Sequence, residues 1–243
     1  VPDCPICVPL GAHLSCGVVG KRARCVALGK NLIVQAAAHH SYCDLRIVVL
    51  CEQEETAQWE FCRWLPHCWD EGHTARLIAN TPETIRALLE RLEPVFSARA
   101  AAGQNAGLGA APRAKPWYLF VCAAPETVTQ HAFMKFLTAN RRELGISVLY
   151  LFDRIDLLPE ECHDILDCRE AVGVLFERRH ASRKQPFQPE QVPQARYEQF
   201  ARSMAPLRME AKGAPALPRS VSFLQGYHVS RPSELALDKN WAN

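Results

Sequence analysis

The chain has 243 residues, of which 48% are hydrophobic, and its formal net charge is only +2, from 28 basic and 26 acidic side chains. This balance excludes the bulk electrostatic attraction on which non-specific binding to nucleic acids or membrane surfaces depends. No signal peptide is evident, and no apolar run approaches the roughly 20 residues needed to cross a bilayer. Because the chain begins at Val1 without an initiator Met, we expect a globular segment excised from a longer protein.

The first half of the chain alternates short apolar runs with helical patterns. Thr81, Pro82 and Glu83 form a helix start, with a capping hydroxyl, a proline in the first turn and a carboxylate near the positive end of the helix dipole. An apolar stripe follows from Ile85 to Phe96. Before that helix we predict strands at residues 7–10, 14–19, 44–51 and 75–79, a buried helix ending near His39, and a short amphipathic helix at 56–64.

The second half continues the alternation and then changes composition. Residues 98–116 are rich in Ala and Gly, and we expect a mobile surface loop there. We then predict strands at 117–122, 146–152 and 173–176, and a helix from Pro125 to about Arg142. Alternating strands and helices predict a three-layer α/β domain over residues 1–178, with a mostly parallel sheet between helices. Residues 179–243 read as a tail with short helices at 194–204 and 221–227.

The turn after the strand at 14–19 stands where nucleotide-binding α/β proteins carry a phosphate loop, since helix N-termini attract anions. A functional loop reads Gly-x-x-x-x-Gly-Lys-Ser/Thr. This chain has no second glycine and no Lys-Ser/Thr pair; it reads Gly20, Lys21, Arg22, Ala23, Arg24, Cys25, Val26. We interpret the loop as a degenerate phosphate loop that lies across the place where phosphates would sit. Lys21, Arg22 and Arg24 could bind an anion, contact a neighbouring domain, or be a solvated basic loop. We expect substitution of any of the three to leave the stability of the domain nearly unchanged.

Four runs resemble one family in order along nearly the whole chain. They are NLIVQAAAHHSYCDLRIVVL, WEFCRWLPHCW, KFLTANRRELGISVLYLFDRIDLLPEEC and SVSFLQGYHVSRPSEL. Together they resemble the EssC/YukB-type FtsK/SpoIIIE-like ATPases of Firmicute type VII secretion systems, in the region between the membrane anchor and the first motor domain. The resemblance implies a P-loop-NTPase-like fold with a degenerate nucleotide site. Where active modules have a Walker B Ser-Asp-Glu, this chain has Cys122, Ala123 and Ala124.

The resemblance also sets our functional expectation. We expect a non-catalytic coupling domain of a membrane-anchored secretion motor, at the cytoplasmic face of the bacterial cell membrane, with residues 179–243 leading to the next ATPase module. ATP and Mg²⁺ would bind only in downstream modules. Expected partners are neighbouring ATPase domains of the same chain, other secretion components and secreted proteins, with membrane contact only through anchors outside the segment and no nucleic acid. The alternatives are a nucleotide-binding ATPase domain with an atypical loop and a DNA-translocase-like segment.

Possible metal ligands do not have the spacing of known sites. Cys62, His67, Cys68 and His73 depart from the Cys-x₂₋₄-Cys and His-x₃₋₅-His pairings of zinc sites. Cys4 and Cys7 form a single CxxC without a helix signal after it. We therefore expect no metal, and eleven reduced cysteines that are mostly buried. Asp153 and Asp156 could be an acid pair, although ending the strand and capping the next turn is the simpler interpretation.

An aromatic segment follows the strand at 44–51. It contains Trp59, Arg63, Trp64, His67 and Trp69. Aromatic residues and Arg dominate interface hot spots, so the segment could anchor a partner. Equally, its tryptophans could cover the sheet from inside, because periodicity does not separate a core aromatic from an interface one.

Overall fold

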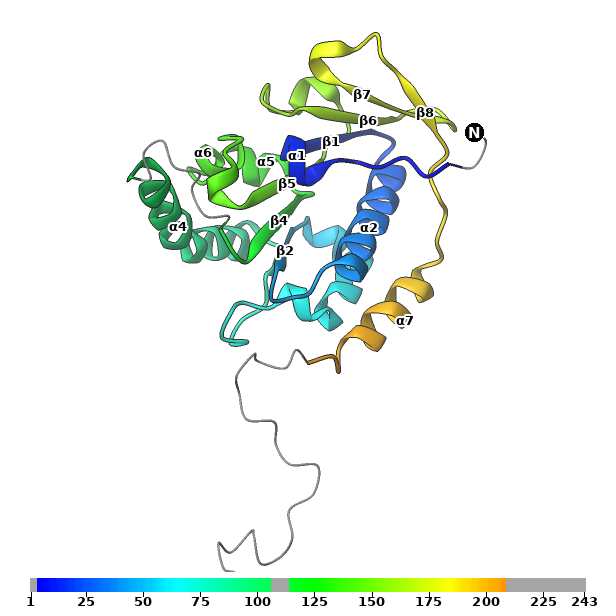
Figure 1. Ribbon diagram of the computed structural model, residues 1–243. Helices are drawn as coiled ribbons and strands as arrows, with labels where there is room; N and C mark the ends of the chain where they lie inside the picture. Colours follow the sequence, from blue (N-terminus) through cyan, green and yellow to red (C-terminus); the bar gives the residue numbers. More distant parts are fainter. Residues whose placement is uncertain (1–3, 106–113, 209–243) are drawn as a thin grey trace, which may run out of the picture. The chain divides into compact units, whose positions relative to one another are not determined.

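The computed structural model describes residues 4–105 and 114–208, and those up to Leu207 belong to one compact unit. Its eight-stranded sheet has the order β3-β2-β4-β5-β1-β6-β7-β8 (Figure 1). The strands are β1 Ser15–Gly20, β2 Leu45–Leu50, β3 Ile78–Ala79, β4 Trp117–Cys122, β5 Ile146–Leu151, β6 Asp164–Cys168, β7 Gly173–Glu177 and β8 Gln185–Phe187. The α-helices are α1 Leu10–His13, α2 Arg22–His39, α3 Thr56–Trp59, α4 Pro82–Asn105, α5 Pro125–Thr129, α6 Met134–Leu137 and α7 Gln194–Met204. The 3₁₀ turns are η1 Gln53–Glu55, η2 Glu60–Trp64, η3 Pro66–Cys68, η4 Arg142–Leu144, η5 Ile155–Leu157 and η6 Arg178–His180.

The strands from β3 to β6 in this order are parallel, and β7 and β8 extend the sheet in antiparallel fashion. Every residue of β1, β2 and β5 is buried. Parallel strands covered on both faces are expected to be largely apolar, and these three are, apart from Ser15, Arg46 and Ser147. The mostly parallel sheet predicted from the sequence is therefore confirmed.

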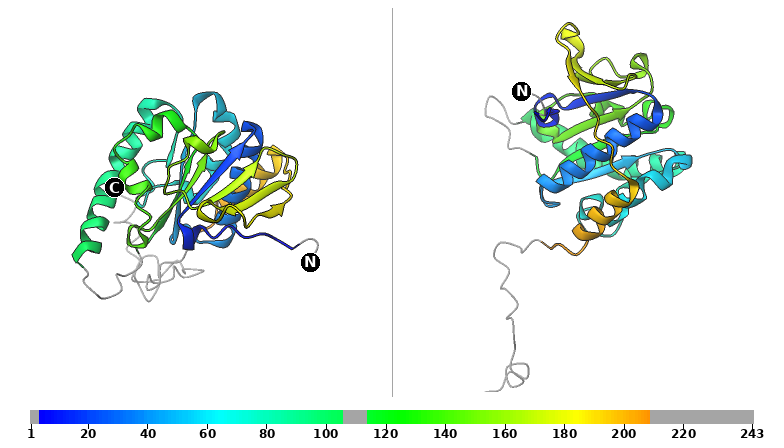
Figure 2. Two further views of the ribbon diagram at one scale, coloured as in Figure 1. Left: turned by 90° about the horizontal axis from the view of Figure 1, so that it is seen from above. Right: turned by 90° about the vertical axis from the view of Figure 1, so that its right-hand side faces the viewer.

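Helices cover the two faces of the sheet and complete a three-layer α/β fold (Figures 1 and 2). Successive side chains of a strand point to opposite faces. In β4, Tyr118 and Phe120 belong to the core formed with α4, α5 and α6. Leu119 and Val121 belong to the opposite core, formed with α2 and α7. None of the helices in the described ranges has both the length and the apolar character needed to cross a bilayer.

The expected loop at residues 98–116 is wrong in its first part, because α4 continues to Asn105. Alanine has the highest helix propensity, so this Ala-rich stretch favours helix when a neighbouring surface supports it. Arg99 supplies such support, since its guanidinium donates hydrogen bonds to the carbonyl oxygens of Leu144 and Pro116, both at 2.9 Å. The remaining residues, 106–113, lie outside the described ranges.

Other predicted elements also need correction. Residues 7–10 form no strand; Pro9, which has no N–H, instead precedes the single turn of α1. The strand predicted at 75–79 shortens to β3, and the helix predicted from Pro125 divides into α5 and α6. The sequence reading missed β6, whose apolar run is interrupted by Asp167, and β8, whose central residue is Pro186.

The compact unit continues beyond the predicted boundary at residue 178. β8 pairs with β7, and α7, which coincides with the predicted helix at 194–204, packs against α2. The Tyr197 hydroxyl donates to Asn31 Oδ1 at 2.6 Å, and Lys30 Nζ donates to Gln194 Oε1 at 2.9 Å. These buried contacts make α7 part of the α/β unit. The helix predicted at 221–227 lies outside the described residues.

Replacing Phe96 tests the packing of α4 on the sheet. Phe96 is fully buried. The centroid of its ring lies 5.2 to 6.1 Å from the ring centroids of Tyr118, Phe120, Phe133 and Phe136. We expect Phe96→Ala to lower the free energy of unfolding by about 3–5 kcal/mol, because it leaves a cavity in this aromatic cluster. Val95→Ala, on the exposed neighbour, should change it by about 0.5 kcal/mol or less in the same urea titration. Equal losses in the two variants would contradict the packing.

Candidate functional site

The turn from β1 into α2 is closed by backbone contacts. Gly20 has a φ of 135°, and a Cβ there would lie 2.6 Å from the backbone carbonyl carbon of Cys168. Only glycine allows this approach of β6 without strain. The Gly20 N–H, which could otherwise face an anion, donates to the Asp153 carbonyl oxygen at 3.2 Å. The glycine is thus required by the packing of the strands, and its N–H is already used within the protein.

Arg22, the first residue of α2, lies across the carboxyl ends of two central strands. Its Nη1 donates to the carbonyl oxygen of Leu151, which ends β5, at 2.6 Å. Its Nη2 donates to the carbonyl oxygen of Ala123, just after β4, at 2.5 Å. In open α/β sheets, ligands bind in the crevice outside the carboxyl ends of the strands. In this chain a guanidinium group fills part of that crevice.

Glu55, in η1 just after β2, neutralises this guanidinium. Its carboxylate accepts two hydrogen bonds from Arg22, at 2.5 Å from Nε and 2.6 Å from Nη2. The Asp153 carboxylate is farther away, 3.8 Å from Nη1. Burial by itself lowers the pKa of Arg22, but the hydrogen bonds and charge of Glu55 outweigh it, so the pKa is raised overall. The arginine therefore stays charged, and the carboxylate of Glu55 is the anion that it binds.

The segment at the expected Walker B position meets this ion pair. Cys122, Ala123 and Ala124 are all buried. The Ala123 N–H donates to the Leu50 carbonyl oxygen at 2.7 Å, and the Ala123 carbonyl oxygen accepts a hydrogen bond from Arg22 Nη2. None of the three side chains offers an oxygen for Mg²⁺. The structure thus brings together the two segments that the sequence analysis interpreted as degenerate.

The basic residues of the turn differ from one another, which corrects our expectation that all three can be replaced without loss of stability. Lys21 is exposed, as expected of a solvated residue. Arg24 Nη1 donates to the carbonyl oxygens of Cys168 and Arg169, at 3.3 and 3.1 Å. Arg22 differs most, because its side chain is 26% exposed and joins three segments. The sequence analysis missed its partner Glu55, although the acidic run from Glu52 to Glu55 directly after a buried strand could have indicated it.

The aromatic segment divides between core and surface. Trp59 and His67 are each 1% exposed, so they belong to the interior. Trp64 is half-buried, with the Arg202 guanidinium of α7 at 4.3 Å from its ring, and Trp69 is half-buried beneath Arg76 at 3.6 Å. Arg63 is exposed and pairs with Glu60 at 2.5 Å. Of these five residues, Trp64, Trp69 and Arg63 therefore keep surface that a partner could contact.

The ligands considered for zinc do not form a common site. His67 Nε2 lies 2.8 Å from the carbonyl oxygen of His40, while His73 lies in an exposed turn. Cys62 and Cys68 are buried, and burial raises the pKa of the Cys62 thiol well above its usual range. Within residues 4–105 and 114–208, the one group of His, Cys, Asp or Glu side chains placed to share an ion is a different one: His13, His163 and Asp164.

Two further pairs from the sequence analysis lie apart from this group. Cys4 and Cys7 are exposed, and all eleven cysteines, each of them in the described ranges, are free thiols. The Asp156 carboxylate pairs with Arg154, whereas that of Asp153 faces Arg22. The two aspartates therefore do not form an acid pair.

Comparison with known proteins identifies relatives among secretion proteins, although no family model matches the chain. It is 26% identical over 231 residues to the ESX secretion system protein EccC of Geobacillus thermodenitrificans, covering 95% of this chain and 15% of that protein. It is 24% identical over 231 residues to the type VII secretion system protein EssC of Staphylococcus aureus, covering 94% of this chain and 16% of that protein. The chain thus spans about a sixth of the length of these relatives.

Solved structures share the fold. EssC (ATPases 2 and 3) from Geobacillus thermodenitrificans matches with a TM-score of 0.55 at 9% identity, over 80% of this chain and 45% of that one. The cytoplasmic domain of the Thermomonospora curvata type VII secretion ATPase EccC matches with a TM-score of 0.55 at 15% identity, over 79% of this chain and 28% of that one. These similarities confirm the P-loop-like α/β fold predicted from the sequence.

Substitutions of the ion pair test its structural role. We expect Arg22→Ala to lower the free energy of unfolding by about 2 kcal/mol, since it leaves the Glu55 carboxylate and two strand-end carbonyl groups without their donor. Lys21→Ala, on the exposed neighbour, should cost about 0.5 kcal/mol or less. A double-mutant cycle with Glu55→Ala should give a coupling of at least about 1 kcal/mol. Additive losses would contradict the pairing.

Thiol reactivity tests the burial of the cysteines. Burial raises the pKa of Cys25 and Cys51 to about 12, so only about one in ten thousand of these groups is a thiolate at pH 8. Titration of the native chain with a thiol reagent at pH 8 should show fast reaction of Cys4, Cys7 and Cys43, which are exposed. The buried thiols should react only after unfolding in denaturant. Fast reaction of all eleven thiols in the native chain would contradict the structure.

Proposed function

We propose that this chain, which is homologous to the EssC and EccC ATPases of type VII secretion over 95% of its length, forms an ATPase-like domain that does not hydrolyse ATP. The observation that carries the proposal is the Arg22 guanidinium, bonded at once to Glu55 and to the carbonyl oxygens of Leu151 and Ala123. The pair lies at the carboxyl ends of the central strands, where a nucleotide phosphate would be held.

Hydrolysis of ATP requires a phosphate cradle, a ligand for Mg²⁺ and a group that positions the attacking water. The loop after Gly20 has no Lys-Ser/Thr pair, and Cys122, Ala123 and Ala124, at the expected Walker B position, have no carboxylate. Glu55 lies nearby, but both its oxygens accept hydrogen bonds from Arg22. A phosphate would have to displace this carboxylate from a paired and largely buried position, which is costly for both charges.

The role we propose is mechanical coupling within a longer secretion motor. A sheet packed between two helical layers has a core of low compressibility, and such a core transmits strain. The expected partners are neighbouring ATPase domains of the same chain, other secretion components and secreted proteins, and the expected location is the cytoplasmic face of the cell membrane. ATP and Mg²⁺ would act in other modules. The near-neutral charge of the chain argues against a nucleic-acid partner.

A nucleotide titration tests the absence of a working site. The purified chain is heated with increasing Mg²⁺-ATP, and hydrolysis is measured in parallel. If a site exists, ATP at 100 times its Kd would raise the free energy of unfolding by about 2.7 kcal/mol and the melting temperature by several degrees. We expect no saturable rise and no Mg²⁺-dependent hydrolysis above background.

Two variants separate a real site from weak charge attraction. Lys21→Ala and Arg24→Ala remove the other cations of the turn while Arg22 and Glu55 stay paired. Saturable stabilisation by Mg²⁺-ATP in the wild-type chain, lost in these variants, would overturn the proposal and favour a nucleotide-binding domain. Hydrolysis lost in the same variants would show that the chain is an enzyme.

A further inference from the structure

We propose that His13, His163 and Asp164 form a site for a divalent transition-metal ion, with Zn²⁺ as the best fit. The site is separate from the Arg22–Glu55 pair and does not depend on the proposed function. It joins the end of α1 to the start of β6, across 151 positions of sequence. The sequence analysis expected no metal, but it considered only the cysteines and the histidines near them. The present proposal replaces that expectation.

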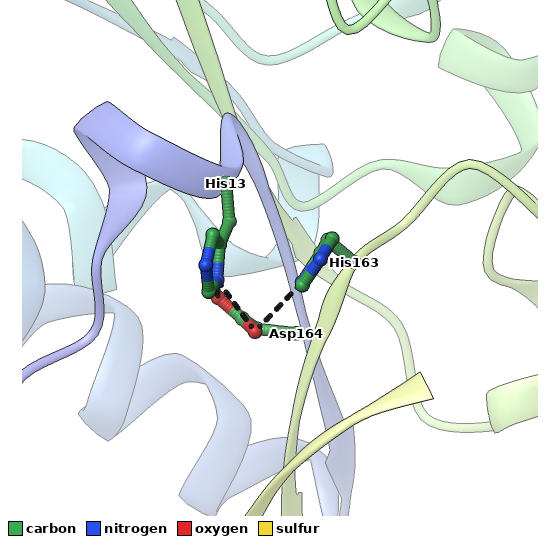
Figure 3. Close-up of side chains that lie close together, drawn as sticks. All are labelled: His13, His163 and Asp164. Carbon is green, nitrogen blue, oxygen red and sulfur yellow. Dashed lines mark hydrogen bonds and ion pairs between the residues drawn. The ribbon is translucent and has the colours of Figure 1, made fainter. Parts of the chain in front are cut away.

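Both imidazole rings aim one nitrogen at the same carboxylate (Figure 3). His13 Nδ1 lies 2.8 Å from Asp164 Oδ2 and 3.0 Å from Oδ1, and His163 Nδ1 lies 3.0 Å from Oδ1. The two rings are tilted against each other, with centroids 4.0 Å apart and planes inclined at 33°. The three candidate ligand atoms all lie within 4.8 Å of one another.

The nitrogen–oxygen separations are close to those of a zinc site, and the two ring nitrogens lie within 4.8 Å of each other. Zn–N and Zn–O bonds of roughly 2.0 to 2.2 Å place the ligand atoms around one tetrahedral ion about 3.4 Å apart. The nitrogen and oxygen atoms that are now hydrogen-bonded would therefore need to separate by only a few tenths of an ångström. His163 and Asp164 are neighbours in sequence, and adjacent ligands are unusual, but here their polar atoms already face each other at 3.0 Å.

Asp164 is a nearly buried carboxylate. Its side chain is only 3% exposed, and in the described part of the chain its ion-pair partners are the two histidines. A histidine brings positive charge to this carboxylate only when it is protonated. A buried carboxylate requires a compensating charge, and a divalent cation would supply it.

The backbone around the three residues is firmly held. The Ser15 hydroxyl, itself buried, donates to the Glu161 carbonyl oxygen and accepts from the His163 N–H, both at 3.1 Å. Asp164 is paired with Cys16 of β1 on one side and with Glu177 of β7 on the other. A site on rigid elements keeps its ligands in place before the ion arrives.

The donor set selects the class of metal. Imidazole suits Zn²⁺, Cu²⁺, Ni²⁺ and Fe²⁺, whereas Ca²⁺ and Mg²⁺ prefer oxygen ligands alone. Two imidazoles and one carboxylate with a fourth position open to water form a recognised zinc arrangement. The side chains of His13 and His163 are 31% and 36% exposed, so an ion can reach the site from solvent and keep a water ligand.

The test is a titration of the full chain with Zn²⁺ by calorimetry, and with Co²⁺ by absorption spectroscopy. It uses the wild type and Cys4→Ser/Cys7→Ser, because that exposed thiol pair could bind zinc independently. We expect one ion per chain in both proteins, a Co²⁺ spectrum without a thiolate charge-transfer band, and a higher melting temperature with Zn²⁺. His13→Gln or His163→Gln should weaken binding at least about tenfold.

A matched control is available in the neighbouring pair of His180 and Glu177. His180 Nδ1 lies 3.0 Å from Glu177 Oε2, so this is a histidine–carboxylate pair without a second histidine. His180→Gln should leave metal affinity unchanged. Asp164→Asn, which removes the third ligand, should also weaken binding. If this variant fails to fold, His13→Gln on the short helix α1 and the wild-type Co²⁺ spectrum still decide the question.

Three results would overturn the proposal. The first is no stoichiometric binding by the wild type, which would make the trio a hydrogen-bonded clamp only. The second is affinity unchanged in the His13→Gln/His163→Gln double variant. The third is binding that is lost in Cys4→Ser/Cys7→Ser, which would assign the ion to the thiols.

Discussion

The arginine at the start of α2 connects three segments at the carboxyl ends of the central strands, the edge of the sheet at which open α/β proteins bind ligands. Its guanidinium bonds to Glu55 after β2, to the end of β4 and to the end of β5. Hydrogen bonds to charged groups in a largely buried setting are among the stronger ones in proteins. The three strand ends and the helix are therefore fixed relative to one another by the protein's own side chains, without a ligand.

The apolar runs of the sequence predicted the sheet well because strands buried on both faces, such as β2 and β5, are apolar along most of their length, with Arg46 and Ser147 as the exceptions. Local composition was less informative where tertiary contacts decide the outcome. Arg99 anchors an alanine-rich stretch as helix, and β6 is a strand because β1 and β7 pair with it, despite Asp167 in its run. The compact unit extends past residue 178 because Tyr197 and Lys30 form hydrogen bonds between α7 and α2, and hydrophobic periodicity does not predict such partners.

The candidate sites show the same division. The absence of Lys-Ser/Thr and of a carboxylate could be read directly from the sequence, since motifs are local. That Arg22 would meet Glu55, 33 positions away, and that His13 would meet Asp164, 151 positions away, could not. Such pairs form only when the strand order brings separate loops to one end of the sheet. A missing motif is thus visible in a sequence, whereas what has taken its place is visible only in the fold.

The strand-end ion pair also has an evolutionary consequence. A lineage that replaced Arg22 to regain a phosphate loop would first leave Glu55 largely buried without its cation and the carbonyl groups of Leu151 and Ala123 without donors. It would gain nothing until a lysine, a hydroxyl and a metal-binding carboxylate had all been added. Each intermediate would be less stable than its ancestor and no more active. If the domain has the function that we propose, the loss of its nucleotide site is therefore hard to reverse. Its descendants should diversify at their surfaces while Arg22 and Glu55 persist.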